Sequence, residues 1–129
     1  MPVCAVLRFR EADGRVPFDL WVATLTSAGK PHDLVAVTKI MAALQRLADV
    51  GHELRRPTSA PLRDGIFELR VSVGRVNYRV LYFFAGPTIA VLSHGCTKER
   101  VVDSIEVDRA VSRRKAYLAS PPLHTASAP

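Results

Sequence analysis

The 129-residue chain contains two cysteines and no long apolar run, and both shortages exclude classes of protein. Cys4 and Cys96 form no CxxC pair, so we expect two reduced thiols in a cytoplasmic protein, with a single disulfide as the alternative. No run of about 18 apolar residues occurs, so no membrane span is expected. The N-terminal MPVCAVLRFREADG has a short apolar stretch with no basic region before it, which is not the pattern of a signal peptide.

Sequence motifs for several common chemistries are also missing. There is no GxxxxGK[ST] loop, no GxGxxG fingerprint and no GxSxG elbow. The cysteines and histidines are too scattered for a zinc site. They are Cys4, His32, His52, His94, Cys96 and His124. We therefore expect neither a metal nor a cofactor.

Positive charge is confined to the second half of the chain. Residues 1–53 hold six Lys or Arg and six Asp or Glu, whereas residues 54–129 hold twelve and six, so the whole net charge of +6 lies there. This asymmetry is typical of a surface for a polyanion such as nucleic acid. A solvated basic face that only aids solubility is the alternative.

Strict alternation of apolar and polar residues predicts two neighbouring strands over residues 66–84. Short turns join them to each other and to a third strand over residues 88–94, which His94 ends and after which Gly95 lets the chain turn. The three form an antiparallel meander. A first strand is expected over residues 3–10. We expect five core side chains around the sheet: Leu44, Phe67, Leu69, Val71 and Val80.

Helices are predicted before and after this meander in the sequence. Residues 18–29 fit a short helix, and residues 32–50 a longer one that ends at Gly51. Its apolar residues recur at spacings of three and four, which predicts a buried stripe of Leu34, Val37, Met41, Leu44 and Leu47. A final helix follows Asp103, which has the form of a capping box with Glu106. The order β-α-α-β-β-β-α predicts an α+β domain over residues 1–118, and residues 119–129 have the composition of a disordered tail.

Arg70 and Arg79 stand inside the strands of the predicted hairpin. Each lies on the less apolar face of its strand, so the two can share a face. Two neighbouring guanidinium groups repel unless an anion lies between them, and each offers a planar fork of donors that matches phosphate oxygens. The structural alternative is that Arg70 pairs with Glu68 or Glu99 and Arg79 with another acid.

Four segments in residues 54–118 resemble one protein family. They are LRRPTSAPLRDGIFELRV, YRVLYFF, LSHGCTKE and EVDRAVSRRKAYL. Together they resemble the phage-derived HigB-like branch of the RelE/ParE toxin superfamily. The resemblance implies a RelE-like small domain, with a mainly antiparallel sheet, two N-terminal helices and one C-terminal helix.

The resemblance also implies an activity, namely a toxin of a toxin–antitoxin pair that cleaves mRNA in the ribosomal A site without a metal. The ribose 2′-hydroxyl attacks the adjacent phosphate, so the enzyme must stabilise a dianionic phosphorus centre and move protons. Arg70 in ELR, Arg79 in YRVLY and Lys98 in TKE match basic positions of the family. The implied partners are a cognate helix-turn-helix antitoxin, the ribosome and mRNA, in the cytoplasm.

The chain departs from the family pattern where protons would be transferred. Many members have a Phe and then two lysines, whereas this chain has Cys96 and then Lys98-Glu99, and residues 101–104 lack the tyrosine of RelE. The acid and base therefore stay unassigned, with His94 and Glu99 as candidates. Two other functions stay open: a ParE-like toxin that inhibits DNA gyrase, and a catalytically inactive basic binding module.

Overall fold

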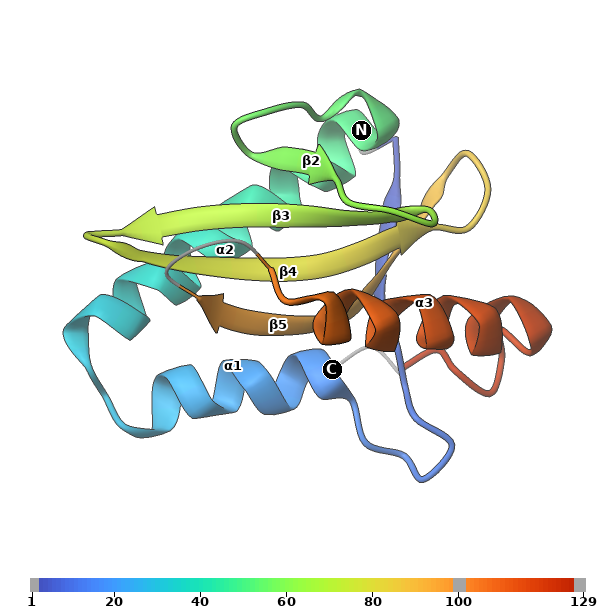
Figure 1. The fold of residues 1–129 in the computed structure, drawn as a ribbon, viewed down its shortest axis with the longest axis horizontal. Coiled ribbons are helices and arrows are strands. Elements are labelled where there is room, and N and C mark those ends of the chain that lie inside the picture. The colour runs from blue at the N-terminus through green and yellow to red at the C-terminus, as the bar shows by residue number, and fades with distance from the viewer. Residues whose placement is uncertain (1–2, 99–101, 127–129) are drawn as a thin grey trace.

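The computed structural model describes residues 3–98 and 102–126 and centres on one five-stranded sheet (Figure 1). Its strands lie in the order β1-β5-β4-β3-β2, and all neighbours are antiparallel except β1 and β5, which are parallel. The strands are β1 Ala5–Arg8, β2 Ser59–Pro61, β3 Ile66–Val73, β4 Val76–Phe84 and β5 Ile89–Lys98. The predicted α+β class and the antiparallel meander are thus confirmed.

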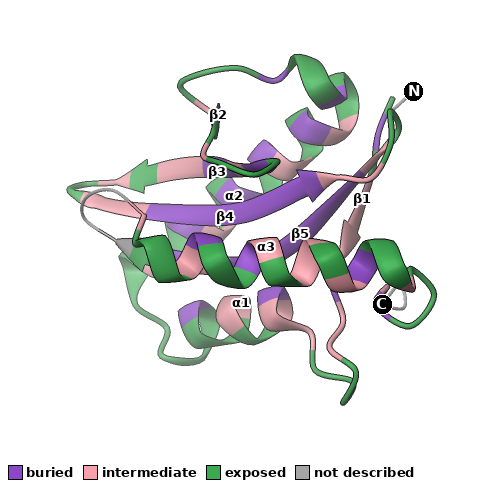
Figure 2. Cartoon of the chain, turned by 45° about the vertical axis from the view of Figure 1, so that its right-hand side comes forward, coloured by how far each residue is buried: buried purple, intermediate pink, exposed green. Residues whose placement is uncertain are grey.

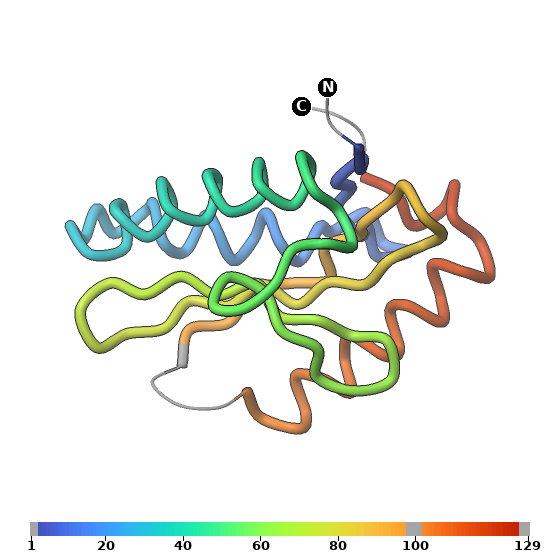
Figure 3. Tube along the Cα trace, turned by 90° about the horizontal axis from the view of Figure 1, so that it is seen from above, coloured from blue at the N-terminus to red at the C-terminus, as the bar shows by residue number. Residues whose placement is uncertain are grey.

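Three helices cover the two faces of the sheet. Viewed from above, α1 (Pro17–Ser27) and α2 (Pro31–Val50) lie on one side, and α3 (Ser104–Ala119) lies on the other (Figure 3). Gly51 ends α2 with a φ of 57°, a conformation that glycine adopts without strain, and a single 3₁₀ turn, η1 (Gly51–Glu53), follows. No helix within the described residues has the length and apolar character needed to cross a membrane.

Two apolar cores result, one on each face of the sheet. The larger lies under α1 and α2, where Leu69 and Val80 are buried and Leu44, Phe67 and Val71 pack half-buried at its margin. The smaller lies under α3 and is built around Ile66, Leu81, Phe83 and Tyr117. Because both faces are covered, β4 is buried along most of its length (Figure 2).

The buried stripe of α2 differs from the predicted one. The structure buries Ala36, Ile40, Ala43 and Leu47, whereas Leu34 and Met41 are 43% and 44% exposed. The buried positions also recur at spacings of four and three, so the sequence holds two apolar stripes on neighbouring sides of the helix. The small alanines allow α2 to approach the sheet closely, which explains why the stripe with smaller side chains faces inward.

The predicted end of the last strand at His94 is wrong, because β5 continues to Lys98. Gly95 lies inside the strand rather than in a turn. A Cβ atom there would be 2.0 Å from Cε3 of Trp21, so the indole of α1 occupies the space of the missing side chain. Gly95 therefore serves the packing of α1 on β5.

Residues 120–126, which composition assigns to a disordered tail, dock against β1. Ala126 donates its N–H to the Arg8 carbonyl at 2.9 Å, and Thr125 forms an antiparallel bridge with Phe9. The buried His124 ring stacks on Phe9 at a centroid distance of 5.0 Å. The docked segment pairs with the C-terminal end of β1 at Arg8 and with the two residues after it, and residues 127–129 lie outside the described part of the chain.

Candidate active site

Arg70 and Arg79 are directly opposite each other on β3 and β4. Arg79 is in turn opposite Cys96 on β5, and Lys98 pairs through its backbone with Asn77, the residue two before Arg79. Because side chains on a strand alternate between faces, all of these positions lie on the face that carries α3. Register thus places the strand positions of three predicted cations, Arg70, Arg79 and Lys98, on one patch of the sheet, which we call the basic row.

Arg79 is the buried member of the basic row. It is 3% exposed, and its Nε lies 3.0 Å from Oε2 of Glu68, which is also buried. A buried guanidinium needs a nearby counter-charge, because removing both groups from water costs several kcal/mol each. Glu68 therefore fixes the position of Arg79, whereas the structural alternative assigns Glu68 or Glu99 to Arg70 and a different acid to Arg79.

Arg70 is the exposed member of the basic row. Its side chain is half-buried, and within residues 3–98 and 102–126 neither Glu68 nor any other acid forms an ion pair with it. Glu99, the other acid suggested from the sequence, lies outside those residues. Arg70 thus lies beside a buried, oriented arginine, and Glu68 compensates the charge of Arg79 but not that of Arg70.

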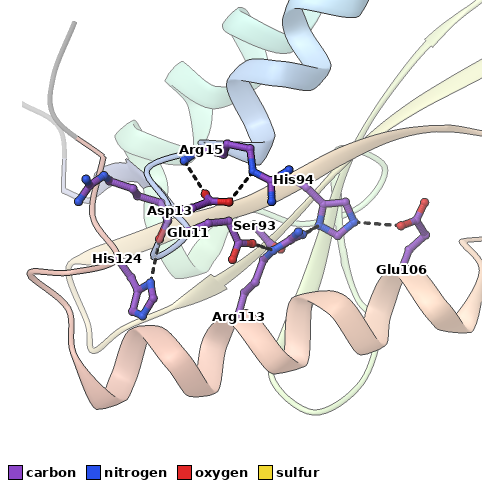
Figure 4. Close-up of polar contacts among 9 residues, drawn as sticks. Glu11, Asp13, Arg15, Ser93, His94, Glu106, Arg113 and His124 are labelled. Carbon is purple, nitrogen blue, oxygen red and sulfur yellow. Dashed lines mark hydrogen bonds and ion pairs between the residues drawn. The ribbon is translucent and has the colours of Figure 1, made fainter.

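His94 lies two residues before Cys96 on β5, on the same face, and its side chain joins the sheet to α3 (Figure 4). Its Nδ1 is 3.0 Å from Nη1 of Arg113, and its Nε2 is 3.2 Å from Oε1 of Glu106. Arg113 also donates to Glu11 at 2.8 Å, and Glu106 accepts from Arg109 at 2.9 Å. This chain of five residues, the α3 network, ties the loop after β1, β5 and α3 together.

The α3 network settles the protonation of His94. Arginine only donates hydrogen bonds, so Nδ1 of His94 accepts from Arg113, with the Ser93 hydroxyl oxygen 2.8 Å from the same nitrogen. The ring proton then resides on Nε2 and is donated to Glu106. Burial and the neighbouring Arg113 charge lower the pKa of His94, against the opposing effect of Glu106. His94 is therefore neutral near pH 7 with both ring nitrogens occupied, and its role in proton transfer stays a prediction.

One predicted site residue is placed only in part and another is not described. Lys98 is the last residue of β5 and is located through its backbone, and Glu99 lies outside the described residues. In the described part of the chain, no three His, Cys, Asp or Glu side chains come close enough together to hold a metal ion.

Sequence reasoning missed the α3 network. Glu106, which a capping box would use at the helix start, instead accepts from His94 and Arg109. The signal in the sequence is weak: Arg109 and Arg113 recur at a spacing of four, three residues after Glu106, but nothing local assigns them to a strand histidine. A register shift between Leu81 and Tyr82, which leaves Ser93 as the extra residue, sets the direction of His94.

Comparison with known families places this geometry in context. Residues 31–115, more than half of the 129-residue chain, match the family described as phage derived protein Gp49-like (DUF891). The chain belongs to the Gp49-like family. This phage-derived family is of the RelE/HigB toxin type, and the matched range contains α2, the whole hairpin, β5 and most of α3. A comparison with curated proteins finds no match.

Proposed function

We propose that this Gp49-like protein is the toxin of a toxin–antitoxin pair and cleaves translated mRNA on the ribosome without a metal. The observation that carries the proposal is the direct pairing of Arg70 with Arg79 across β3 and β4. Like charges directly opposite each other destabilise a sheet, and Glu68 compensates only one of the two. A phosphate over the basic row would compensate the rest.

The basic row suits the charge that develops when RNA is cut by its own 2′-hydroxyl. The 2′ oxygen forms a bond to phosphorus, the bond to the 5′ oxygen breaks, and the products are a 2′,3′-cyclic phosphate and a 5′-hydroxyl. Negative charge grows on the non-bridging oxygens in between, and preorganised cations stabilise it. Arg70 would contact these oxygens with its planar fork, while Arg79, held by Glu68, supplies a fixed positive field.

Two proton transfers complete the reaction. A base takes the proton of the 2′-hydroxyl, and an acid protonates the departing 5′ oxygen. His94 and Glu99 are the candidates, and the neutral state of His94 suits a base better than an acid. For His94 to act, Nδ1 or Nε2 must first exchange Arg113 or Glu106 for substrate.

The proposal includes a partner and a location. A helix-turn-helix antitoxin encoded beside this protein would neutralise it, and its acidic surface would cover the basic second half of the chain. Activity on translated mRNA places the protein in the cytoplasm. Co-expression should restore growth and yield a co-purifying complex, and a protein that is harmless alone and binds no neighbouring gene product contradicts this part.

The decisive experiment is inducible expression followed by mapping of RNA 5′ ends. We expect cuts phased with codons in translated mRNA, and Arg70→Ala should reduce them about 10²–10³-fold because one charge donor is lost. Arg70 is half-buried without a described acid partner, so its loss should leave the melting temperature nearly unchanged. Arg75→Ala, which removes an exposed charge from the turn of the same hairpin, is the matched control.

The alternative functions give different outcomes. Gyrase-dependent DNA breaks without RNA cuts would indicate a ParE-like toxin. No cuts of either kind and no growth defect would indicate a basic binding module. An Arg70→Ala variant that remains fully toxic and normally folded removes the basic row from the mechanism.

A further inference from the structure

A pocket of about 430 Å³ lies beside β2, where the loop after η1 meets the start of β3. Its volume is within the ~300–1,000 Å³ range of sites for small organic ligands. Leu54, Pro61 and Phe67 supply apolar wall, and Arg55 and Arg56 supply two cations. The part of the wall between Leu54 and Pro61 contains no acidic residue. The pocket thus combines an aromatic ring with positive charge.

The pocket is adjacent to the basic row because the segment that lines it pairs with β3 beside Arg70. Arg70 donates its backbone N–H to the Thr58 carbonyl at 2.8 Å, and Ser59 pairs with Leu69. Arg56 is two residues before Thr58, in the turn that leads into β2.

Further cations border this edge of the sheet. Arg46 of α2 donates to Oγ1 of Thr58 at 2.9 Å, and Lys39 donates to the Ser72 carbonyl at 2.9 Å. Arg70 points to the α3 face and Phe67 to the α1–α2 face, so a ligand that reaches both must cross the edge at Thr58. The three-residue β2 makes that edge thin.

The backbone of β2 disfavours an added peptide strand. Ser59 donates its N–H to the Arg55 carbonyl, Leu62 donates to the Ile66 carbonyl, and Pro61 has no N–H. Three of the four positions over residues 59–62 therefore offer no donor to a further strand. A ligand recognised by stacking and charge fits this edge better than one recognised by a β-ladder.

We propose that this pocket binds a nucleobase of single-stranded RNA, with Arg55 and Arg56 on the flanking phosphates. The inference rests on the proposed function, because the RNA is the same strand whose phosphate lies at the basic row. Stacking on an aromatic ring accepts every base, while the walls of a closed pocket discriminate bases by size and polarity. The pocket would therefore set the nucleotide preference next to the cut.

The test uses the isolated full chain and a fluorescein-labelled, 2′-O-methylated hexanucleotide, which cannot be cleaved by its own 2′-hydroxyl. Fluorescence anisotropy gives the dissociation constant. Phe67→Leu should weaken binding about 5- to 100-fold, the range that base stacking supplies. Arg56→Ala should lower the slope of log affinity against log salt by about one. Arg15→Ala, an exposed arginine on the loop before α1, is the matched charge control and should bind as wild type does.

Phe67 also contacts Tyr82 and Phe84, so Phe67→Leu can lower the stability of the fold as well as RNA binding. Arg56→Ala removes a charge at the pocket without changing these ring contacts, and so tests binding independently of folding. Wild-type protein that does not bind the hexanucleotide, or variants that bind as tightly as the Arg15 control, overturn the proposal. If an acidic peptide binds more tightly than the hexanucleotide, and Arg56→Ala weakens that binding, the pocket belongs to a protein partner instead.

Mapped RNA ends separate this inference from the proposed function. If wild-type cuts persist and the Arg56 and Phe67 variants keep the same nucleotide preference, the pocket proposal fails and the nuclease stands. If no cuts occur but the variants lose RNA binding as expected, the nuclease fails and the pocket stands.

Discussion

Arg79 and Arg70 are equivalent in the sequence pattern but differ in what their loss should do. Arg79 shares a buried ion pair with Glu68, so Arg79→Ala leaves an uncompensated carboxylate among apolar groups. We expect this variant to lose about 3–5 kcal/mol of stability, which urea unfolding measures. Arg70→Ala should remain close to wild type.

A paired substitution tests this assignment. Replacing both Glu68 and Arg79 by Met removes both charges while keeping apolar volume, and should recover much of the stability lost by Arg79→Ala. It should not recover toxicity. An Arg79→Ala protein that unfolds at the wild-type urea concentration would show that the ion pair contributes little.

His94 predicts a pH dependence of stability. Its pKa is lowered in the folded protein from the ordinary value of 6.5, so the unfolded chain binds the proton more readily. The stabilisation is fully present above pH 6.5 and decreases as the pH falls below it. Urea unfolding at pH 7.5 and 5.5 should show this loss in the wild type and a smaller one in His94→Asn, which keeps an acceptor for Arg113. Equal losses in both proteins would contradict the prediction.

At the scale of elements, the contact of α1 with β5 depends on one missing side chain. A methyl group at Gly95 would lie within 2.0–2.4 Å of three Trp21 ring carbons, so Gly95→Ala must displace the indole. We expect a loss of about 1–3 kcal/mol or more, measured by thermal melting. Trp21→Ala is destabilising alone, but adding it to Gly95→Ala should cost less than the sum of the two. Strict additivity would place the strain elsewhere.

Sequence patterns predicted the elements whose signals are local. Alternation located β3 and β4, and helical spacing with Gly51 located α2 and its end. The three-residue β2 was missed, because a segment this short, with Pro61 inside it, shows no alternation. The parallel pairing of β1 with β5 and the choice between the two stripes of α2 depend on distant parts of the chain.

The candidate site likewise has features that the sequence pattern predicts and features that it does not. The shared face of Arg70 and Arg79 follows from strand period, and it was predicted. The pairing of Arg79 with Glu68 depends on which acid near Arg79 is buried in the folded protein. The α3 network, from Glu11 to Glu106, joins segments about a hundred residues apart. Neither distance nor burial is encoded in a local pattern.

At the scale of the whole molecule, the two ends of the chain stabilise each other. Residues 120–126 pair with the C-terminal end of β1, and His124 donates from Nδ1 to the Arg10 carbonyl at 2.8 Å while it stacks on Phe9. Truncation after residue 118 should lower the melting temperature and increase aggregation through the uncovered edge. Truncation after Ala126 is the control and should melt as the full chain does. Equal melting of both would mean that the docked segment adds no stability.

The parallel pairing of β1 with β5 has a consequence for how the protein is made. Ala5 is synthesised before its partner Ile89, and Phe9 before its partner Thr125. Contacts between such distant residues form late and slow folding. The nascent chain therefore cannot pair β1 until β5 has also been synthesised. For a protein that we propose to act on translation, this order of assembly would delay activity until β5 has joined the sheet.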